Sequence, residues 1–297
     1  MRKKPDIQIV TASSILGLRP TGVERLAEVL LSNGLQQKLN SANAVIDVPT
    51  LNHLYSSLRE PHGVLNAAPL TAFSKSLKET LSKIDIAKKF VLVLGGDCSI
   101  LIGIMAALRS KGTFGLFFMD AHADFYEPEK SITGEAADME LAIVTGRGPD
   151  LLVNIDNLKP YVHDENVIHI GQRDMEETRR YGSQEIRSTG IKCIDLQRLQ
   201  QQSLLQTKTE IDDHVRKMNA GRFWIHFDTD VIGDMENPAV DYRIPGGLSF
   251  KDCQGILNNL IQAHPTIGMS VTIFNPDLDS DEKVAKKIAD LISNVLS

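Results

Sequence analysis

Cysteine is scarce in this chain of 297 residues. The three that are present, Cys98, Cys193 and Cys253, are widely spaced and odd in number. This pattern excludes a disulfide framework as the basis of the fold and indicates reduced thiols. Reduced thiols are typical of the cytoplasm, so we expect a cytoplasmic location.

The chain also lacks a long hydrophobic run and an excess of positive charge. The N-terminal Met1 to Lys4 is basic, but only a short apolar stretch follows Pro5 and Asp6, so we expect neither a signal peptide nor a membrane span. The formal net charge of -6 argues against a nucleic acid partner. We therefore expect a small-molecule substrate and contact with neither nucleic acid nor membrane.

Low-complexity tracts, charge blocks and internal repeats are missing as well. The length is ordinary for one parallel α/β domain, so we predict a single domain spanning residues 1–297. Short apolar or β-branched runs alternate with helical patterns, which predicts βαβ units and a mainly parallel sheet. The predicted strands are Phe90–Leu94, Phe114–Met119, Val167–Ile170, Phe223–Phe227 and Ile267–Ile273. The predicted helices are Ala72–Lys89, Ile100–Ser110, Glu210–Met218, Phe250–Ala263 and Asp281–Leu296.

A further helix is expected near the N-terminus. Thr21 and Glu24 have the spacing of a capping box, and Leu26, Val29 and Leu30 would lie on one face of the helix that follows. This helix is a scaffold element in our interpretation.

Two clusters of carboxylates and imidazoles each follow a predicted buried strand. The first is Asp120, His122 and Asp124, and the second is His226, Asp228 and Asp230. Alternate positions of a strand share a face, and open α/β sheets bind ligands outside the carboxyl ends of their strands. We therefore expect both clusters at one rim of the sheet.

A single Asp-x-Asp at a strand end is commonly a turn or a helix cap. Two clusters at the ends of buried strands are different, because their charges would repel one another and be poorly solvated without a cation. The sequence therefore predicts one dinuclear metal site. Its carboxylate-rich ligands favour Mn²⁺ or a similar hard to borderline ion.

Five motifs occur in a fixed order along the chain. They are Gly95-Gly96-Asp97-x-Ser99, Asp120-Ala-His122-x-Asp124, Phe227-Asp228-x-Asp230, Pro245-Gly246-Gly247-Leu248 and Asn275-Pro276. In this order they resemble the arginase/agmatinase/formimidoylglutamase (ureohydrolase) family. The resemblance implies a three-layer α/β/α fold, a binuclear Mn²⁺ cluster, hydrolysis of guanidino or related amidine groups, and a homo-oligomer, either a trimer or a hexamer.

The resemblance also implies which residues hold two divalent ions. One set is Cys98, Asp120, Asp124 and Asp228, and the other is Asp120, His122, Asp228 and Asp230, so that Asp120 and Asp228 bridge. Two cations that share a water lower its pKa and hold a bridging hydroxide for attack on a trigonal carbon. Asp124 would accept a hydrogen bond from that hydroxide and orient it.

The sequence departs from the family pattern at the first ligand, where the family has His and this chain has Cys98. A thiolate is softer than an imidazole and favours Zn²⁺, Fe²⁺ or Ni²⁺. Two interpretations stay open: Cys98 is a ligand, or it is a small buried thiol in a site that holds one metal or a weakly bound second one.

Two further departures concern the substrate. The catalytic His of the family falls on Ala137 and its substrate-binding Glu falls on Ile273, so we expect a substrate other than L-arginine. Glu135, Asp138 and His226 are the nearby candidates to carry a proton in place of the missing His. For His226, a structural imidazole beside the ligands is an equally open reading.

Acidic and aromatic residues suggest how a substrate would be bound. Glu176 falls where arginases place an acidic residue near the substrate amine, and Asp138 adds acidity, so an amine-bearing substrate is expected. Tyr126 and Tyr242 are candidates to shape the pocket, although loop residues of this kind are more often merely solvated.

The leading hypothesis is a metal-dependent hydrolase of a C–N bond in a linear amidine, a guanidino compound or a related amide, acting through the metal-bridging hydroxide. The alternative is a catalytically silent family member that binds a metal or a small molecule, motivated by Ala137 and Ile273. The presence of Asp120, His122, Asp124, Asp228 and Asp230 argues against this alternative, because a protein without turnover does not need five desolvated polar groups. A third hypothesis, a two-metal phosphoesterase, is supported by Asp120 and His122 alone. The sequence lacks the further Asn-His pair that such enzymes need.

Overall fold

The computed structural model describes residues 5–50 and 55–297. Met1 to Lys4, on which the expectation of no signal peptide partly rests, lie outside the described residues. The described strands form one sheet of eight, ordered β2-β1-β3-β8-β7-β4-β5-β6, and every neighbouring pair is parallel. They are β1 Asp6–Ala12, β2 Ile46–Asp47, β3 Lys89–Gly95, β4 Gly115–Met119, β5 Val167–Ile170, β6 Lys192–Ile194, β7 Phe223–Asp228 and β8 Thr266–Thr272. The predicted parallel sheet is confirmed.

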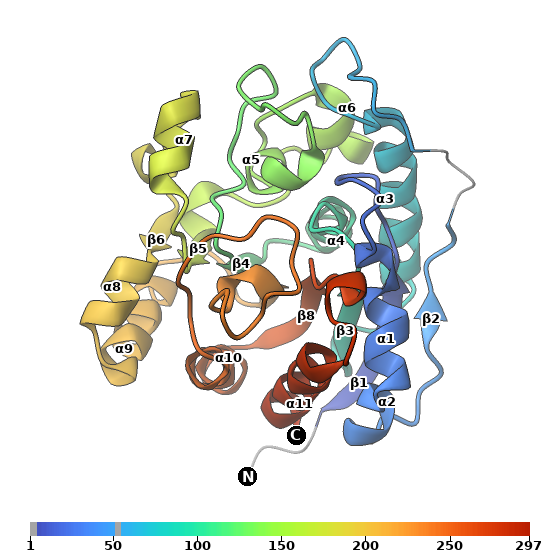
Figure 1. The fold of residues 1–297 in the computed structure, drawn as a ribbon, viewed down its shortest axis with the longest axis vertical. Helices are drawn as coiled ribbons and strands as arrows, with labels where there is room; N and C mark the ends of the chain where they lie inside the picture. The colour runs from blue at the N-terminus through green and yellow to red at the C-terminus, as the bar shows by residue number, and fades with distance from the viewer. Residues whose placement is uncertain (1–4, 51–54) are drawn as a thin grey trace.

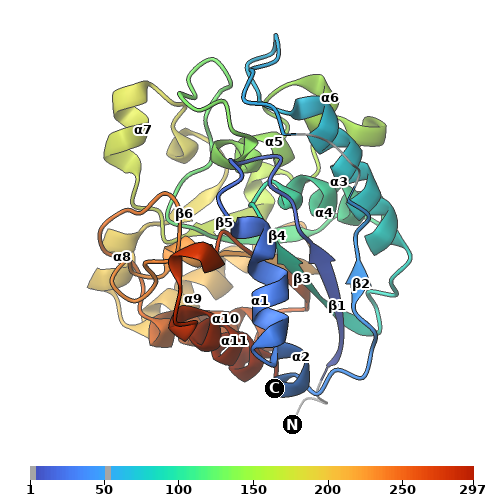
Figure 2. The same ribbon diagram turned by 45° about the vertical axis from the view of Figure 1, so that its right-hand side comes forward.

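Helices cover both faces of this sheet, which confirms the three-layer α/β/α architecture (Figure 1). The α-helices of the described residues are α1 Leu26–Ser32, α2 Leu35–Lys38, α3 Ala67–Ser82, α4 Ile100–Arg109, α5 Glu140–Val144, α6 Asp150–Val153, α7 Met175–Tyr181, α8 Leu196–Gln201, α9 Leu204–Val215, α10 Phe250–Gln262 and α11 Lys283–Leu296. Helices α3 to α6 pack on one face, and α1, α2, α10 and α11 pack on the other; Figure 2 shows the two groups from a second angle.

The strands are apolar on both sides because both faces are covered. In β3, Val91 and Val93 lie in the core beneath α3 and α4, while Phe90, Leu92 and Leu94 lie in the core beneath α1 and α11. Burial of alternate residues in two separate cores fixes the register of the strand, because a shift by one residue would exchange the two faces.

Two predicted helices are displaced in the structure. The predicted helix Ala72–Lys89 instead begins at Ala67 and ends at Ser82, because the chain has to turn before β3 starts. The predicted helix Glu210–Met218 is α9, which begins earlier, where Ser203 and Gln206 form a capping box.

The capping box expected at Thr21 is not formed. Gly22, at a positive φ of 126°, precedes a short 3₁₀ turn, and α1 starts only at Leu26. The Thr21 hydroxyl instead donates a hydrogen bond to the carboxylate of Asp241 at 2.9 Å. Tertiary contact has therefore replaced the local cap.

In the part of the chain that the structure describes, every helix is too short or too polar to cross a membrane.

Four neighbouring strands deliver the sequence motifs to one edge of the sheet. The chain leaves β3 at Gly95, β4 at Met119, β7 at Asp228 and β8 at Thr272, and these strands are adjacent in the order β3-β8-β7-β4. Because all of them run in the same direction, their carboxyl ends meet at the same edge. The turn after β3 is tight, since a Cβ on Gly96 would overlap the backbone of Ser14.

Close packing in the middle of the sheet gives the first prediction. A Cβ on Gly268 of β8 would overlap the Trp224 ring and the Val91 carbonyl oxygen. Gly268→Ala is therefore expected to lower the free energy of unfolding by roughly 1–3 kcal/mol. Denaturant unfolding followed by the fluorescence of Trp224 measures this. Gly221→Ala is the control, because a Cβ there meets no atom within 4 Å, and equal midpoints for the two variants would contradict the packing argument.

Candidate metal centre and pocket

Asp120 and Asp228 meet at the carboxyl edge of the sheet. Asp120 directly follows β4, and Asp228 is the last residue of the neighbouring strand β7. One ligand atom from each lies within 4.8 Å of the other and of a ring nitrogen of His226. A second group within the same limit joins Asp120 to His122 and Asp124. The structure thus brings the two sequence clusters into one centre.

Backbone N–H groups orient these carboxylates. The Asp120 carboxylate accepts a hydrogen bond from the N–H of His122 at 2.7 Å, and the Asp230 carboxylate accepts one from the N–H of Ala121 at 3.1 Å. Asp124 adopts a left-handed φ of 44°, a costly conformation for a residue with a Cβ. The loop after β4 is therefore held in one shape, with its carboxylates converging.

His122 and Asp230 form an ion pair at this centre. Nδ1 of His122 lies 2.8 Å from Oδ2 of Asp230 and 3.6 Å from Oδ1 of Asp120. Although burial opposes a charge on the imidazole, these two carboxylates raise the pKa of His122 well above its ordinary value. Burial also opposes ionisation of Asp230, yet His122 holds the pKa of that carboxyl below its ordinary value. A divalent cation bound by these side chains would take the place of the His122 proton.

In the other three carboxyl groups of the centre, Asp120, Asp124 and Asp228, burial outweighs the attraction of His122. Burial, and next the charge of a neighbouring carboxylate, raises the pKa of Asp120 to about 7 and the pKa values of Asp124 and Asp228 well above their ordinary value. Oδ2 of Asp120 is buried and has no hydrogen-bond partner among the described residues. The donor set fits divalent cations, because a cation supplies the partner that these oxygens lack.

Cys98 is buried in the turn between β3 and α4. Its Sγ donates a hydrogen bond to the carbonyl oxygen of Ala137 at 3.3 Å and lies within 4.8 Å of carboxylate oxygens of Asp124 and Glu140. Burial, reinforced by the charge of Glu140, raises the pKa of the Cys98 thiol well above its ordinary value. Cys98 therefore lies on the Asp124 side of the centre.

Glu140 is absent from the sequence-based site. It is the first residue of α5, its side chain is fully buried, and the polar side chains that its carboxylate meets are the Asp124 carboxyl and the Cys98 thiol. Burial raises the pKa of Glu140 well above its ordinary value. One signal was present in the sequence, since Glu140 is the only charged residue in the apolar run Met139–Val144.

His226 does not reach the cavity, so the interpretation as a proton carrier or substrate contact is corrected. Its side chain is fully buried, and its ring stacks on Phe118 with centroids 5.0 Å apart. Nδ1 lies 2.9 Å from the hydroxyl of Ser270, which also accepts a hydrogen bond from Nε1 of Trp224 at 3.1 Å. Burial lowers the pKa of His226 to about 3, so the imidazole is neutral. The structural reading of this histidine fits its position.

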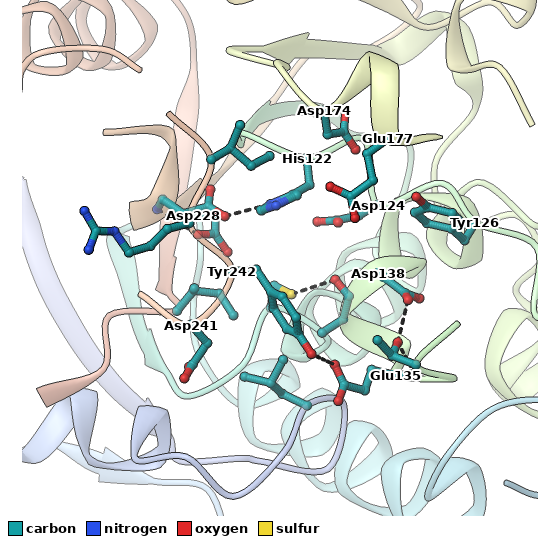
Figure 3. A pocket seen from close by; sticks show the side chains of 18 of the residues that line it. His122, Asp124, Tyr126, Glu135, Asp138, Asp174, Glu177, Asp228, Asp241 and Tyr242 are labelled. Carbon is teal, nitrogen blue, oxygen red and sulfur yellow. Dashed lines mark hydrogen bonds and ion pairs between the residues drawn. The ribbon is translucent and has the colours of Figure 1, made fainter. Parts of the chain in front are cut away.

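A cavity of about 430 Å³ opens above the centre (Figure 3). Its lining includes metal-ligand candidates, polar groups from loops and an apolar part: Cys98, His122, Asp124, Asp228, Asp230, Tyr126, Glu135, Asp138, Asp174, Glu177, Tyr242, Leu18, Ala137 and Ile273 are among them. Of the residues predicted to bind substrate, Tyr126, Asp138 and Tyr242 line the cavity. Glu176 is exposed and is not among the lining residues, whereas the next residue, Glu177, is.

Glu135 is engaged at both carboxylate oxygens. Oε1 pairs with Nε of Arg19 at 2.6 Å, and Oε2 accepts a hydrogen bond from the Tyr242 hydroxyl at 2.8 Å. Figure 3 shows Glu135 and Tyr242 on one side of the cavity and Asp174 and Glu177 on the other. A carboxylate fixed by two partners is better suited to shaping a wall than to acting as a free base.

Asp138 is held by two hydroxyl groups. Its Oδ2 accepts hydrogen bonds from Ser131 and Thr133, both at 2.7 Å, and burial raises its pKa to about 6. Asp174 is also fixed, because it accepts hydrogen bonds from the N–H of Ala123 at 3.0 Å and from the side chain of Gln172 at 2.9 Å. Asp174 is a cavity residue that the sequence argument did not include.

The two positions that depart from the family pattern at the substrate lie in one apolar patch. Ile273 packs with Leu18, Cys98 and Val240, and Ala137 packs against the same cluster. Ile273 has a left-handed φ of 68°, which is unusual for a β-branched residue.

Comparison with known proteins finds a matching family model and similar sequences. The family model described as "Arginase family" matches residues 31–297. The arginase of Staphylococcus aureus (strain COL) is 28% identical over 301 residues, covering 98% of this chain and 97% of that protein.

Solved structures of arginases are also similar to this chain. The crystal structure of arginase from Bacillus subtilis has a TM-score of 0.84 at 26% identity and covers 98% of each chain. The arginase from Bacillus caldovelox has a TM-score of 0.88 over 99% of this chain and 98% of its own, but at 23% identity this likeness speaks for the fold alone.

Metal addition gives the second prediction. At a Mn²⁺ concentration of 100 times Kd, binding stabilises the folded state by about 3 kcal/mol, which raises the midpoint of thermal unfolding by about 5 °C in a chain of this size. Asp120→Asn should remove most of this rise. Its metal-free midpoint should equal or exceed that of the wild type, because the amide relieves repulsion between buried carboxylates.

Scanning calorimetry with EDTA or with Mn²⁺ measures both effects. The control is Glu129→Gln, an exposed residue outside the cavity lining, which should respond to Mn²⁺ as the wild type does. A wild-type midpoint that no divalent cation raises would contradict the assignment of a metal centre.

Proposed function

Because the chain belongs to the arginase family, we propose that it is a metal-dependent hydrolase of a C–N bond in a linear amidine, a guanidino compound or a related amide, with a substrate other than L-arginine. Members of this family are hydrolases that act on C–N bonds. The observation that carries the proposal is the convergence of ligand candidates from the ends of β4 and β7 beneath one cavity.

Two divalent cations would be held by the side chains of this centre. Cys98 and Asp124 would hold one ion and His122 and Asp230 the other, and Asp120 and Asp228 would contribute to holding both. We propose Mn²⁺ first because most ligands are carboxylates, with Zn²⁺, Fe²⁺ or Ni²⁺ as alternatives because of the thiol. When bound, the cations supply Lewis acidity that activates water and stabilises negative charge on the substrate.

The side chains around the cations have separate tasks. Asp124 lines the cavity and is the carboxylate that accepts a hydrogen bond from the attacking water and orients it. His226, neutral and paired with Ser270, lies beside Asp120 and Asp228, and the Thr272 hydroxyl donates a hydrogen bond to Asp228 at 3.2 Å and orients that carboxylate. Glu135 positions the Tyr242 hydroxyl at the wall of the cavity.

The lining supports a substrate with two different ends. Ala137 and Ile273 are apolar where the family pattern has a His and a Glu, so a guanidinium in the ordinary geometry of L-arginine lacks the carboxylate that would pair with it at Ile273. Asp174 and Glu177 make another part of the lining acidic and favour a substrate that carries an amine.

The proposal also covers the domain organisation, location and assembly of the protein. We propose a single-domain protein of the cytoplasm that assembles as a homo-oligomer, either a trimer or a hexamer. The three cysteines are free in the structure, which supports a reducing compartment.

The third prediction is hydrolysis itself. Protein loaded with Mn²⁺, Zn²⁺, Fe²⁺ or Ni²⁺ is offered guanidino, ureido, formimino and acylated-amine compounds, and we expect metal-dependent release of the amine product from one of these classes. Asp124→Asn should lower kcat/KM by about 10²–10⁴-fold, because the attacking water is no longer oriented. Glu129→Gln should have wild-type kinetics.

A binding protein without turnover is the second candidate function, and Ala137 and Ile273 favour it. If the protein binds metal but hydrolyses no compound class with any of the metals in this screen, the binding protein is selected over the hydrolase.

The fourth prediction concerns specificity. Ile273→Glu places a carboxylate in the apolar patch and should raise kcat/KM for guanidino compounds by about 10-fold or more over the wild type. The glutamine of Ile273→Gln has the shape of glutamate without its charge, so this variant should not raise kcat/KM for guanidino compounds. Efficient hydrolysis of L-arginine by the wild type would overturn the proposed exclusion of that substrate.

A further inference from the structure

Glu140 is a buried carboxylate for which the described residues offer no basic partner. The side chain is 0% exposed, and the polar side chains that it meets are the Asp124 carboxyl and the Cys98 thiol, which are themselves acidic. Burying an anion without a partner is costly, and an apolar side chain in its place would pack in the run Met139–Val144 without that cost. A stabilising role in the fold therefore does not explain this residue.

The groups next to Glu140 are themselves potential metal ligands. Ligand atoms of Glu140, Cys98 and Asp124 all lie within 4.8 Å of one another, and all three residues are buried. Among the described residues, no basic side chain forms an ion pair with any of the three, because the nearby His122 pairs with Asp230 and Asp120 instead. One divalent cation would give all three a partner at once.

The three residues come from independent parts of the chain. Cys98 follows β3, Asp124 belongs to the loop after β4, and Glu140 begins α5. Asp124 reaches this position through a left-handed backbone conformation. Three separate segments thus bring buried ligand atoms to one point, as the ligands of a metal site do. An acidic patch on the solvated surface shows neither this burial nor this convergence.

We propose that Glu140 is a direct metal ligand that completes, with Cys98 and Asp124, a thiolate-containing site for a borderline-soft divalent ion such as Zn²⁺, Fe²⁺ or Co²⁺. This inference deepens the proposed function and rests on its metal centre. Asp120 and Asp228 are shared by the two halves, so the difference between them is the Cys98 thiolate, which prefers a softer ion than the imidazole of His122 does. The two halves of the centre therefore select different metals.

A cobalt titration tests the proposal without using activity. Metal-free protein is titrated with Co²⁺ under anaerobic conditions, and the thiolate-to-cobalt charge-transfer absorption in the near ultraviolet reports on the Cys98 site alone. In the wild type this band should grow to saturation. Cys98→Ala should abolish it. Glu140→Gln should keep the band at saturation but weaken Co²⁺ binding at this site by about 10-fold or more.

Glu176→Gln is the matched control, because Glu176 is an exposed glutamate outside the cavity lining. It should bind Co²⁺ as the wild type does. Wild-type affinity at the thiolate site in Glu140→Gln would overturn the proposal. So would a wild type that binds Co²⁺ without the charge-transfer band, because the ion would then not contact the thiolate.

A crystal structure of the wild-type protein loaded with Zn²⁺ gives an answer even if the variants fold poorly. The anomalous signal locates the ion, and a Glu140 oxygen about 2.0–2.2 Å from it is the expected result. An ion beyond bonding distance of Glu140 would refute the proposal. Metal bound by Glu140 in a protein that hydrolyses no tested compound would refute the proposed function alone.

Discussion

Repulsion between buried carboxylates at the carboxyl edge of the sheet is the constraint on which the rest of the structure depends. The strand order brings Asp120 beside Asp228, and the loop after β4 adds Asp124. Backbone N–H groups, the Thr272 hydroxyl and the left-handed conformation of Asp124 hold these groups together although burial opposes their ionisation. Such a cluster costs folding free energy, and a cation is the natural way to recover it.

The pocket above the centre is chemically uneven, and this unevenness defines its specificity. Around Ile273 the lining is apolar, whereas around Asp174 it is acidic and fixed by hydrogen bonds. The centre beneath is uneven as well, with an imidazole at one end and the Cys98 thiol at the other. Both contrasts come from loops and turns, while the sheet below them is regular, so selectivity can change without a change of fold.

The central strands and the ligands that follow them were predictable because each signal is local. A buried strand is a short apolar run, and Asp120 or Asp228 follows it directly in sequence. The edge strands β2 and β6 are too short to leave a pattern. Glu140 and Glu177 were missed because tertiary packing alone brings their side chains to the centre and to the cavity. The sequence pointed to Glu176, whereas the lining of the cavity includes its neighbour Glu177, because helical geometry decides which side of α7 faces the cavity.

The only tryptophan of the chain lies directly below this centre. Its indole N–H donates to Ser270, whose oxygen lies 2.9 Å from the His226 ring, and that ring lies beside Asp120 and Asp228. Two hydrogen bonds therefore connect the indole to the imidazole next to the carboxylates. A change of charge among those carboxylates alters the electric field at the indole, so the molecule contains its own optical sensor of whether the centre is charged or neutralised.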